Sequence, residues 1–537
     1  MSLISVSNLT FSYDSSADEI FTDVSFQLDT DWRLGFIGRN GRGKTTFLNL
    51  LMGRYPYSGL IAAPGVEFDY FPFAVENQDR TALSVARNVI APFDEWEEEM
   101  RLYTEDGSDG ALRRYGDVLE LYSAQDGFII NELIEKELTK LSVPAETLAR
   151  PFGTLSGGEK TKLLLAALFL KKHRFLLIDE PTNHLDTQGR HAVSDYLATK
   201  KGFILVSHDR AFLDHCIDHV LSINRCGIEV QKGNYSSWQA NKDRQDTFEL
   251  AQNERLHHDI ARLTAAAENT ARWSDKVEKT KHVRPASGLS PDRGHIGHQA
   301  AKLMKRSKAI EVRREEAVEQ KSQLLKNIEQ SEVLKLTMLK HRAQRLAEAT
   351  DLSVCYGGTQ LFEPVSFTVN AGDRVALAGG NGSGKTSLLK LLLGEDIPHT
   401  GQLRTASGLV ISYAQQDTSS LRGGLREYAK NAGIDESLFM TILRKLDFSR
   451  AQFEKDIADY SGGQKKKVVL AKSLCQPAHL YVWDEPLNFV DLLSRVQIEE
   501  LLLQYQPTMV FVEHDEVFYN KITTKSIVLN RILWNSN

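Results

Sequence analysis

Short apolar runs that end in polar residues recur along the first part of the chain. Residues 34–37 (LGFI), 175–178 (FLLI) and 203–206 (FILV) are almost wholly apolar. Strands of a parallel sheet that are covered on both faces have this pattern. Residues 3–11 instead alternate between apolar and polar positions, which predicts a half-buried strand. The pattern therefore predicts an α/β fold whose central strands are buried and parallel.

The same order of features returns in the second half of the chain. Asp179 and Asp484 each end a buried run, and they lie 305 positions apart. Lys44 and Lys385 each follow a glycine-rich stretch, and they lie 341 positions apart, so the first half carries 36 more residues between these features. A fixed order and spacing of this kind indicates a duplicated module. We place the additional residues near 90–130, where an acidic, helix-like insert begins.

Residues 238–342, between the two modules, are rich in charge and carry apolar residues at roughly helical spacing. Residues 283–294 (VRPASGLSPDRG) contain two prolines and two glycines, which cannot continue a helix. We therefore predict two helices that fold back on each other, with a tip at about 283–297. Basic residues outnumber acidic ones about three to one from 272 to 314. A nucleic-acid contact and a solvated coiled coil both fit this local charge.

Length and composition limit the class of protein. The 537 residues suit three domains, which we place at 1–237, 238–342 and 343–537. The formal net charge of −6 excludes a uniformly basic nucleic-acid binder. The four cysteines form no CxxC pair, so neither a disulfide framework nor a zinc site is expected. No apolar run reaches 18 residues and no signal peptide is evident, so we expect a cytoplasmic protein without a membrane segment.

Residues 38–46 (GRNGRGKTT) contain a GxxxxGK[ST] loop between a predicted strand and a predicted helix. The glycines let the backbone turn its N–H groups toward phosphate oxygens at a helix N-terminus. Lys44 would then reach the outer phosphates, and Thr45 would ligate Mg²⁺. Asp179 would hold Mg²⁺ through water, and Glu180 would orient or deprotonate the attacking water. His208, taken alone, fits a structural role, whereas its place after these motifs favours catalysis.

These motifs resemble those of the ATP-binding cassette family. Besides the phosphate loop, the match includes an LSGG signature at 155–158 and its counterpart YSGG at 460–463. The resemblance implies an α/β fold with two phosphate-loop ATP-binding cassettes joined by a long helical hairpin. It implies an ATPase that uses ATP and Mg²⁺. It assigns catalysis to Glu180, His208, Glu485 and His514.

In the cassette family two modules pack head to tail, and each ATP lies between the phosphate loop of one and the signature of the other. ATP would join the modules, hydrolysis would release them, and the hairpin would change its angle. The tyrosines at 13 and 356 occupy the places where the family stacks the adenine ring. The residues implied in nucleotide binding are Tyr13, Gly38, Asn40, Gly41, Gly43, Lys44, Thr45, Thr46, Ser156, Gly158, Tyr356, Gly379, Asn381, Gly382, Gly384, Lys385, Thr386, Ser387, Ser461 and Gly463. Those implied in Mg²⁺ binding are Thr45, Asp179, Thr386, Gln416 and Asp484.

The two modules depart from each other at two places. Gln416 follows the strand after the second phosphate loop, whereas the matching place in the first module is Phe73, which cannot ligate Mg²⁺ or position water. The second module also reads EPLNF at 485–489, where the first reads EPTNH at 180–184. Both catalytic glutamates remain, so we predict two competent sites that hydrolyse ATP differently, with the first site slower.

Two cassettes joined by a helical hairpin resemble the ABC-F proteins, which act on ribosomes. In that family the linker enters the E site of the 70S ribosome, contacts the P-site tRNA and points at the peptidyl-transferase centre of the 23S rRNA. Residues 272–281, 297–306 and 485–491 resemble the resistance branch associated with lincosamides, streptogramin A and pleuromutilins. The resemblance implies a monomer whose cassettes form an intramolecular sandwich. A housekeeping translation factor of the same family is the alternative.

The basic residues expected to contact RNA are Arg284, Arg293, Lys302, Lys305 and Arg306, although a solvated helix face explains any one of them equally well. Two other classes of cassette ATPase remain as alternatives. A DNA-acting ATPase would show zinc CxxC pairs or a very long coiled coil, and neither is present, so DNA is not an expected partner. A transporter's ATPase subunit would need a membrane partner and leaves the basic hairpin unexplained.

Overall fold

A computed structural model describes residues 2–13, 19–183, 185–224, 227–280, 293–324, 334–356 and 359–532. The chain divides into two compact units. The first comprises Met1–Ile223, Gly227–Tyr235 and Ser331–Asn537, and the second comprises Asn224–Cys226 and Ser236–Gln330. Both cassettes thus belong to the first unit. Residues 334–342, which we had assigned to the hairpin, group with the cassettes.

In the N-terminal cassette, the described strands form a three-stranded sheet and a six-stranded sheet, and the runs predicted to be buried parallel strands lie in the six-stranded sheet. Its antiparallel sheet has the order β2-β1-β4, and its second sheet has the order β5-β6-β7-β3-β8-β9. Neighbouring strands from β5 to β8 pair in parallel, and β6, β7 and β3 are largely buried. The strands are β1 (Leu3–Ser12), β2 (Glu19–Asp29), β3 (Arg33–Ile37), β4 (Ser58–Ala62), β5 (Glu67–Phe71), β6 (Arg174–Asp179), β7 (Phe203–Val206), β8 (His219–Asn224) and β9 (Gly227–Lys232).

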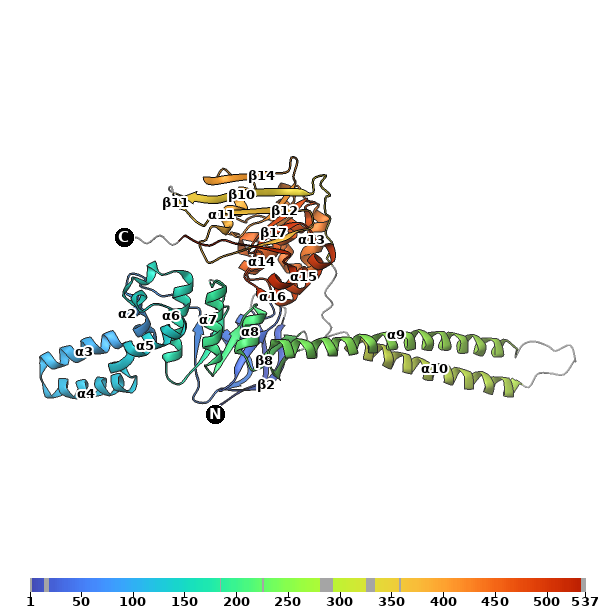
Figure 1. Ribbon diagram of the computed structural model, residues 1–537. Helices are drawn as coiled ribbons and strands as arrows, with labels where there is room; N and C mark the ends of the chain where they lie inside the picture. Colours follow the sequence, from blue (N-terminus) through green and yellow to red (C-terminus); the bar gives the residue numbers. More distant parts are fainter. Residues whose placement is uncertain are drawn as a thin grey trace, which may run out of the picture. The chain divides into compact units, whose positions relative to one another are not determined.

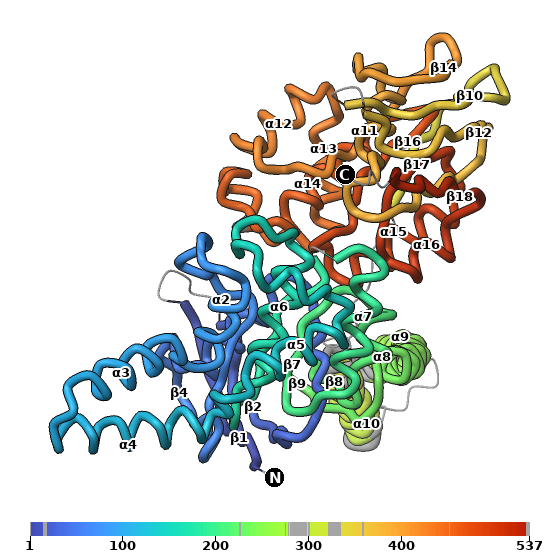
Figure 2. Tube along the Cα trace, turned by 60° about the vertical axis from the view of Figure 1, so that its left-hand side comes forward, coloured from blue at the N-terminus to red at the C-terminus, as the bar shows by residue number. Residues whose placement is uncertain are grey.

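The helices of the N-terminal cassette include the predicted insert. Helices α3 and α4 lie side by side where we placed the additional residues (Figures 1 and 2). The helices are α1 (Lys44–Leu51), α2 (Ala82–Ile90), α3 (Phe93–Asp106), α4 (Asp109–Ala124), α5 (Ile130–Lys140), α6 (Gly157–Leu170), α7 (Thr187–Ala198) and α8 (Arg210–Cys216), with short 3-10 turns at Gly127–Ile129, Ala145–Ala149 and Phe152–Thr154.

The C-terminal cassette repeats this plan. Its parallel sheet has the order β15-β16-β17-β13-β18, and β10 pairs in antiparallel fashion with β11, β12 and β14. The strands are β10 (Arg345–Tyr356), β11 (Thr359–Gln360), β12 (Val365–Asn370), β13 (Arg374–Ala378), β14 (His399–Thr405), β15 (Ile411–Ala414), β16 (Leu480–Asp484), β17 (Met509–Val512) and β18 (Lys525–Val528). The helices are α11 (Lys385–Leu392), α12 (Leu425–Asn431), α13 (Glu436–Lys445), α14 (Gly462–Cys475), α15 (Leu492–Tyr505) and α16 (Glu516–Ile522), with 3-10 turns at Arg450–Glu454 and Ile457–Asp459.

Strand order explains how distant motifs meet. In each cassette the strand that leads to the phosphate loop, β3 or β13, lies beside the strand β7 or β17. The strand β7 or β17 leads to His208 or His514, which we call the switch histidine. The strand that ends in the Asp–Glu pair, β6 or β16, is next. Because the strands are parallel, their carboxyl ends share one edge of the sheet, where α/β proteins place their ligands.

The second unit contains the two predicted long helices. Helix α9 spans Tyr235–Thr280 and α10 spans Arg293–Leu324, and they run beside each other in opposite directions (Figure 1). Most of the predicted tip, 283–292, lies outside the described residues. Within the part of the chain that the structure describes, no helix combines the length and apolarity needed to span a membrane.

Candidate active sites

The two phosphate loops have the same local geometry. Helices α1 and α11 begin at Lys44 and Lys385, each after a glycine with positive φ. Gly43 has a φ of 94°, and a Cβ there would lie 2.5 Å from Ile20 Cγ2, so a larger residue would collide with the neighbouring strand. Lys44 Nζ donates to the carbonyl of Gly38 at 2.6 Å, and Lys385 Nζ donates to its own loop in the same way. Each loop therefore presents a lysine and a helix N-terminus, which together suit phosphate.

The two tyrosines that we expected beneath adenine lie next to these helices. The hydroxyl of Tyr13 lies 2.8 Å from Thr46 Oγ1. The hydroxyl of Tyr356 lies 3.3 Å from Ser387 Oγ, and half of this residue is exposed. Each hydroxyl is thus tied to the first turn of the phosphate-loop helix, which holds the ring beside the loop.

Asp179 has two hydroxyl partners in the first cassette. Thr45 Oγ1 donates to Asp179 Oδ2 at 2.9 Å, and Tyr70 donates to the same oxygen at 3.0 Å. Burial and the Asp179 carboxylate both raise the pKa of Tyr70, so its hydroxyl keeps its proton and acts as a donor. Tyr70 was not among the site residues predicted from the sequence. The signal was its place near the end of β5, three residues before Phe73.

Asp484 occupies the equivalent place in the second cassette and suits a divalent cation. It is fully buried, and neither carboxylate oxygen has a hydrogen-bond partner of normal geometry among the described residues. Burial raises the pKa of Asp484, and the nearby Thr386 hydroxyl partly offsets this rise. A bound Mg²⁺ would stabilise the ionised carboxylate, and Thr386 and Gln416 supply the oxygen ligands that Mg²⁺ prefers.

The two glutamates predicted to be catalytic follow these aspartates but have different surroundings. Glu485 Oε2 accepts hydrogen bonds from Gln416 Nε2 at 2.8 Å and from Asn488 Nδ2 at 2.7 Å. Its other oxygen lies 3.4 Å from His514 Nε2. Burial alone would raise the pKa of Glu485, but His514 and Gln416 outweigh burial and lower the pKa to about 2. Glu485 is therefore held as a carboxylate.

Glu180 lacks this set of partners. Its Oε1 atom lies 3.4 Å from His208 Nε2 and has no partner of hydrogen-bond geometry among the described residues. Burial, and to a lesser extent the negative charge of Asp179, raises the pKa of Glu180 to about 8. Strand register supports the comparison of Phe73 with Gln416. Tyr70 pairs with Leu177 and Tyr413 pairs with Val482, and Leu177 and Val482 are equivalent positions of the repeat, 305 residues apart. Phe73 and Gln416 each lie three residues after these tyrosines, so they are equivalent as well.

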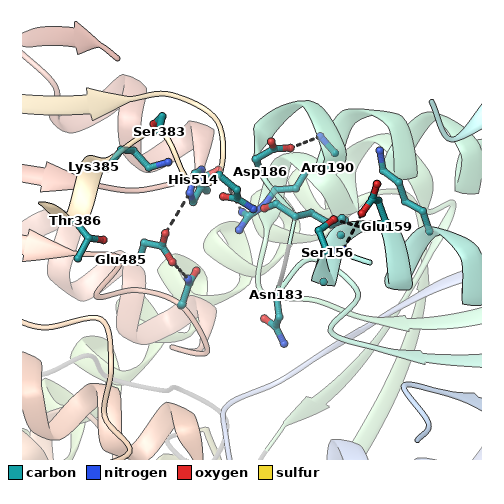
Figure 3. Close-up of a pocket in the computed structure, with 18 of the residues that line it drawn as sticks. Ser156, Glu159, Asn183, Asp186, Arg190, Ser383, Lys385, Thr386, Glu485 and His514 are labelled. Carbon is teal, nitrogen blue, oxygen red and sulfur yellow. Dashed lines mark hydrogen bonds and ion pairs between the residues drawn. The ribbon is translucent and has the colours of Figure 1, made fainter. Parts of the chain in front are cut away.

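One site is a cavity between the cassettes. It has a volume of about 800 Å³ and is lined by Lys385, Thr386 and Glu485 of the second cassette and by Ser156 and Gly158 of the first. Figure 3 shows Lys385, Thr386 and Glu485 on one side of the pocket and Ser156 on the other. Ser156 caps α6 through a hydrogen bond from the Glu159 amide, so the signature also ends at a helix N-terminus. A cavity of this size suits a nucleotide.

The other site brings the two cassettes into direct contact. Asn40 Nδ2 of the first phosphate loop donates to the carbonyl of Phe489 at 2.8 Å. A Cβ at Gly463 would lie 2.8 Å from the same Asn40 nitrogen and 2.4 Å from the Phe489 oxygen, so only glycine fits there. Ser461 caps α14 as Ser156 caps α6. The head-to-tail arrangement thus has one open site and one closely packed site.

The residues expected to bind RNA lie on α10 or outside the described part of the chain. Lys302, Lys305 and Arg306 are exposed along α10. Arg293 begins α10, but its side chain is outside the description, and Arg284 lies wholly outside the described residues.

Comparison with known proteins matches both cassettes. The family model described as ABC transporter matches residues 21–183 and 362–488, more than half of the chain. Each matched segment contains one phosphate loop, one signature and one Asp–Glu pair.

Similar proteins match almost the whole chain. The putative ATP-binding protein YdiF of Bacillus subtilis is 28% identical, and the alignment covers 99% of this chain and 80% of YdiF. The ribosome protection protein VmlR of the same organism is 27% identical, with 97% of this chain and 85% of VmlR covered. Among solved structures, the archaeal ribosome recycling factor aABCE1, in complex with the ribosomal stalk protein aP1, has a TM-score of 0.52. The two proteins are 18% identical, and their alignment covers 97% of this chain and 87% of the aABCE1 chain, which shows a shared fold.

Proposed function

The chain belongs to the ABC transporter family of ATP-binding proteins, and from this membership we propose that it is an ABC-F ATPase that acts on the ribosome. Its tandem cassettes indicate ATPase activity. The observation that best supports head-to-tail use of ATP is the shared cavity, in which the Lys385 loop faces the Ser156 signature. ATP would bridge the two cassettes at each site, and hydrolysis would allow them to separate.

In this proposal each site combines groups from both cassettes. Lys44, Thr45, Asp179, Glu180 and His208 act with Ser461 and Gly463 at one site. Lys385, Thr386, Gln416, Asp484, Glu485 and His514 act with Ser156 and Gly158 at the other. Asp179 and Asp484 hold Mg²⁺, and the glutamates orient the attacking water. The unequal partners of Glu180 and Glu485 support faster hydrolysis at the second site.

The relatives and the helical hairpin support the ribosome as the partner. One relative, which aligns with nearly the whole chain, is named a ribosome protection protein. The exposed cations on α10 suit RNA phosphates, which are recognised mainly by charge. We propose that the hairpin enters from the E site beside the P-site tRNA and approaches the peptidyl-transferase region of the 23S rRNA. Such a protein would work as a monomer in the cytoplasm, where ribosomes are found.

The finer proposal is protection of the ribosome from lincosamides, streptogramin A or pleuromutilins. Its support is the resemblance of residues 272–281, 297–306 and 485–491 to the resistance branch, together with VmlR among the relatives. A housekeeping factor that acts on elongating or stalled ribosomes is the second candidate, since other relatives carry only the name of ATP-binding protein.

The first test is co-sedimentation of the Glu180→Gln, Glu485→Gln protein with 70S ribosomes. We expect the protein in the ribosome pellet with ATP and in the supernatant with ADP, because the variant binds ATP without hydrolysing it. Adding Lys44→Ala and Lys385→Ala should abolish the ATP effect and serves as the matched control. A variant that stays in the supernatant with ATP would exclude the ribosomal function.

The second test is rescue of bacterial cell-free translation inhibited in turn by each drug class. We expect wild-type protein to restore synthesis and a variant shortened between 284 and 294 to fail, although it still sediments with ribosomes. ATP-dependent binding without rescue would assign the protein to the housekeeping role.

A further inference from the structure

The internal repeat reveals a difference beneath the two catalytic loops. Three buried positions that carry hydroxyls in the first cassette carry a lysine, a leucine and a glutamate in the second. Two of these pairs are related by the 305-residue offset, and the third lies directly before each switch histidine. All six residues are buried. The pairs are Thr161 and Lys466, Thr182 and Leu487, and Ser207 and Glu513.

Lys466 and Glu513 each form a hydrogen bond with the backbone of the second catalytic loop, residues 485–488. Lys466 Nζ donates to the carbonyl of Glu485 at 2.9 Å. Glu513 Oε1 accepts from the amide of Leu487 at 2.8 Å, and its Oε2 accepts from the amide of His514 at 3.3 Å. The exposed fractions are only 4% for Lys466 and 8% for Glu513. Burial lowers the pKa of Lys466, which the charge of Glu513 partly offsets, and burial raises the pKa of Glu513 to about 7.

The loop held in this way has an unfavourable backbone. Glu485 has a φ of 47°, in the left-handed region that residues with a side chain rarely adopt. The hydrogen bonds of Lys466 and Glu513 fall on the carbonyl of Glu485 and on the amide two residues later, so together they fix the direction of its side chain.

The first cassette has the same turn without these two contacts. Glu180 has a φ of 52°, and its amide donates to the Val206 carbonyl at 2.8 Å, as the amide of Glu485 donates to Val512. Beneath it, Thr182 Oγ1 lies 3.5 Å from Ser207 Oγ. At these repeat positions, therefore, only the second cassette has charged side chains that contact the loop.

We propose that Lys466 and Glu513 are positioning residues that clamp residues 485–488, so that the Glu485 carboxylate is presented to Gln416 and Asn488. The clamp supports the turnover of the second ATP site and contributes to the difference between the two sites. The inference rests on the proposed catalytic role of Glu485 and does not require the ribosome.

The test transfers the first cassette's residues into the second. All variants carry Glu180→Gln, so that steady-state hydrolysis reports the second site. We expect Lys466→Thr, Leu487→Thr, Glu513→Ser to lower kcat by about tenfold or more, since a displacement of about 1 Å costs up to about 100-fold. KM should change by less than about twofold, because the phosphate loop and signature are untouched.

Two controls separate positioning from a general loss of structure. The same triple substitution in a Glu485→Gln background should leave the turnover of the first site within about twofold. Glu513→Gln keeps an oxygen acceptor for the Leu487 amide, so it should retain most of kcat, whereas Glu513→Ala should lose about as much as the triple variant. Thermal unfolding of each protein checks that the variants are folded.

The proposal fails if the folded triple variant keeps its kcat, or if KM rises while kcat is unchanged. It also fails if Glu513→Gln and Glu513→Ala have equal kcat, which is the decisive comparison if the triple variant does not fold. If Glu485→Gln leaves the second site active, the catalytic role of Glu485 is wrong, and that role is part of the proposed function.

Discussion

Arg210 and Glu499 form a buried ion pair that joins the two cassettes. Arg210, on α8 of the first cassette, donates to both carboxylate oxygens of Glu499, on α15 of the second, with one distance of 3.2 Å. The side chains are 7% and 2% exposed. Glu499 Oε2 also accepts from Lys521 at 3.1 Å, but about half of that lysine side chain lies in solvent. Arg210→Met would therefore leave Glu499 buried with one weak partner.

The expected cost follows from this burial. Removing one member of a buried ion pair costs about 3 to 5 kcal/mol, whereas replacing both members with apolar residues is close to neutral. For a domain of about 200 residues, each kcal/mol lowers the melting temperature by about 2 to 4 °C. We expect Arg210→Met to lower the midpoint of the first thermal transition by about 6 °C or more. Arg210→Met with Glu499→Leu should recover most of that loss.

The assay is calorimetry without nucleotide, scored by the first transition because a chain of several domains does not unfold in one step. The control is Arg101→Met on α3, where a side chain that is 59% exposed pairs with Glu98 and Glu105. Solvent and salt screen such exposed pairs, so they contribute little and this variant should melt close to wild type. The reasoning is refuted if Arg210→Met is no less stable than Arg101→Met, or if the double variant is less stable than Arg210→Met alone.

Three further outcomes follow from individual contacts. Gln416→Phe removes a hydrogen bond to the Glu485 carboxylate. The kcat of the second site, measured in a protein whose first site carries Glu180→Gln, should therefore fall about 10- to 100-fold. An unchanged kcat would contradict this role of Gln416. Burial alone would raise the pKa of Glu137, but hydrogen bonds from two lysines and a tyrosine outweigh it and lower the pKa to about 2. The resulting stability is present above the unfolded pKa of about 4.3 and is lost as pH falls through about 2. In urea titrations, Glu137→Gln should therefore cost about 2 kcal/mol at pH 7 and much less at pH 2. The exposed control Glu135→Gln should be neutral at both pH values. Gly43→Ala should abolish nucleotide binding at the first site, as measured with a fluorescent ATP analogue, because its Cβ would collide with β2; normal binding would show that the loop adapts.

The sequence predicted the cassettes well because their chemistry is local. A phosphate loop is a strand, a glycine-rich turn and a helix N-terminus in one stretch, so Lys44 and Lys385 were identified before any packing was known. The buried runs that end at Asp179 and Asp484 are confirmed as strands β6 and β16 of parallel sheets. The fold class is confirmed by the family match to both cassettes.

Contacts between distant residues were decided by tertiary structure. The hydrogen bond from Tyr70 to Asp179 spans 109 positions, and the bonds from Arg210 to Glu499 span 289. A tyrosine near a strand end, or an arginine two residues after a histidine, gives no sign in the sequence of which carboxylate it will contact. That choice depends on strand order and on how α8 packs against α15.

The sequence by itself therefore determined the content of each half-site, since the residues proposed to bind phosphate and to activate water lie in short motifs. Only the tertiary structure decided how the halves are completed. It made one site an open cavity and the other a direct contact through Asn40, and it gave Glu485 partners that Glu180 lacks. The physical reason is that burial and hydrogen bonding depend on every element packed around a group, and these elements come from both cassettes.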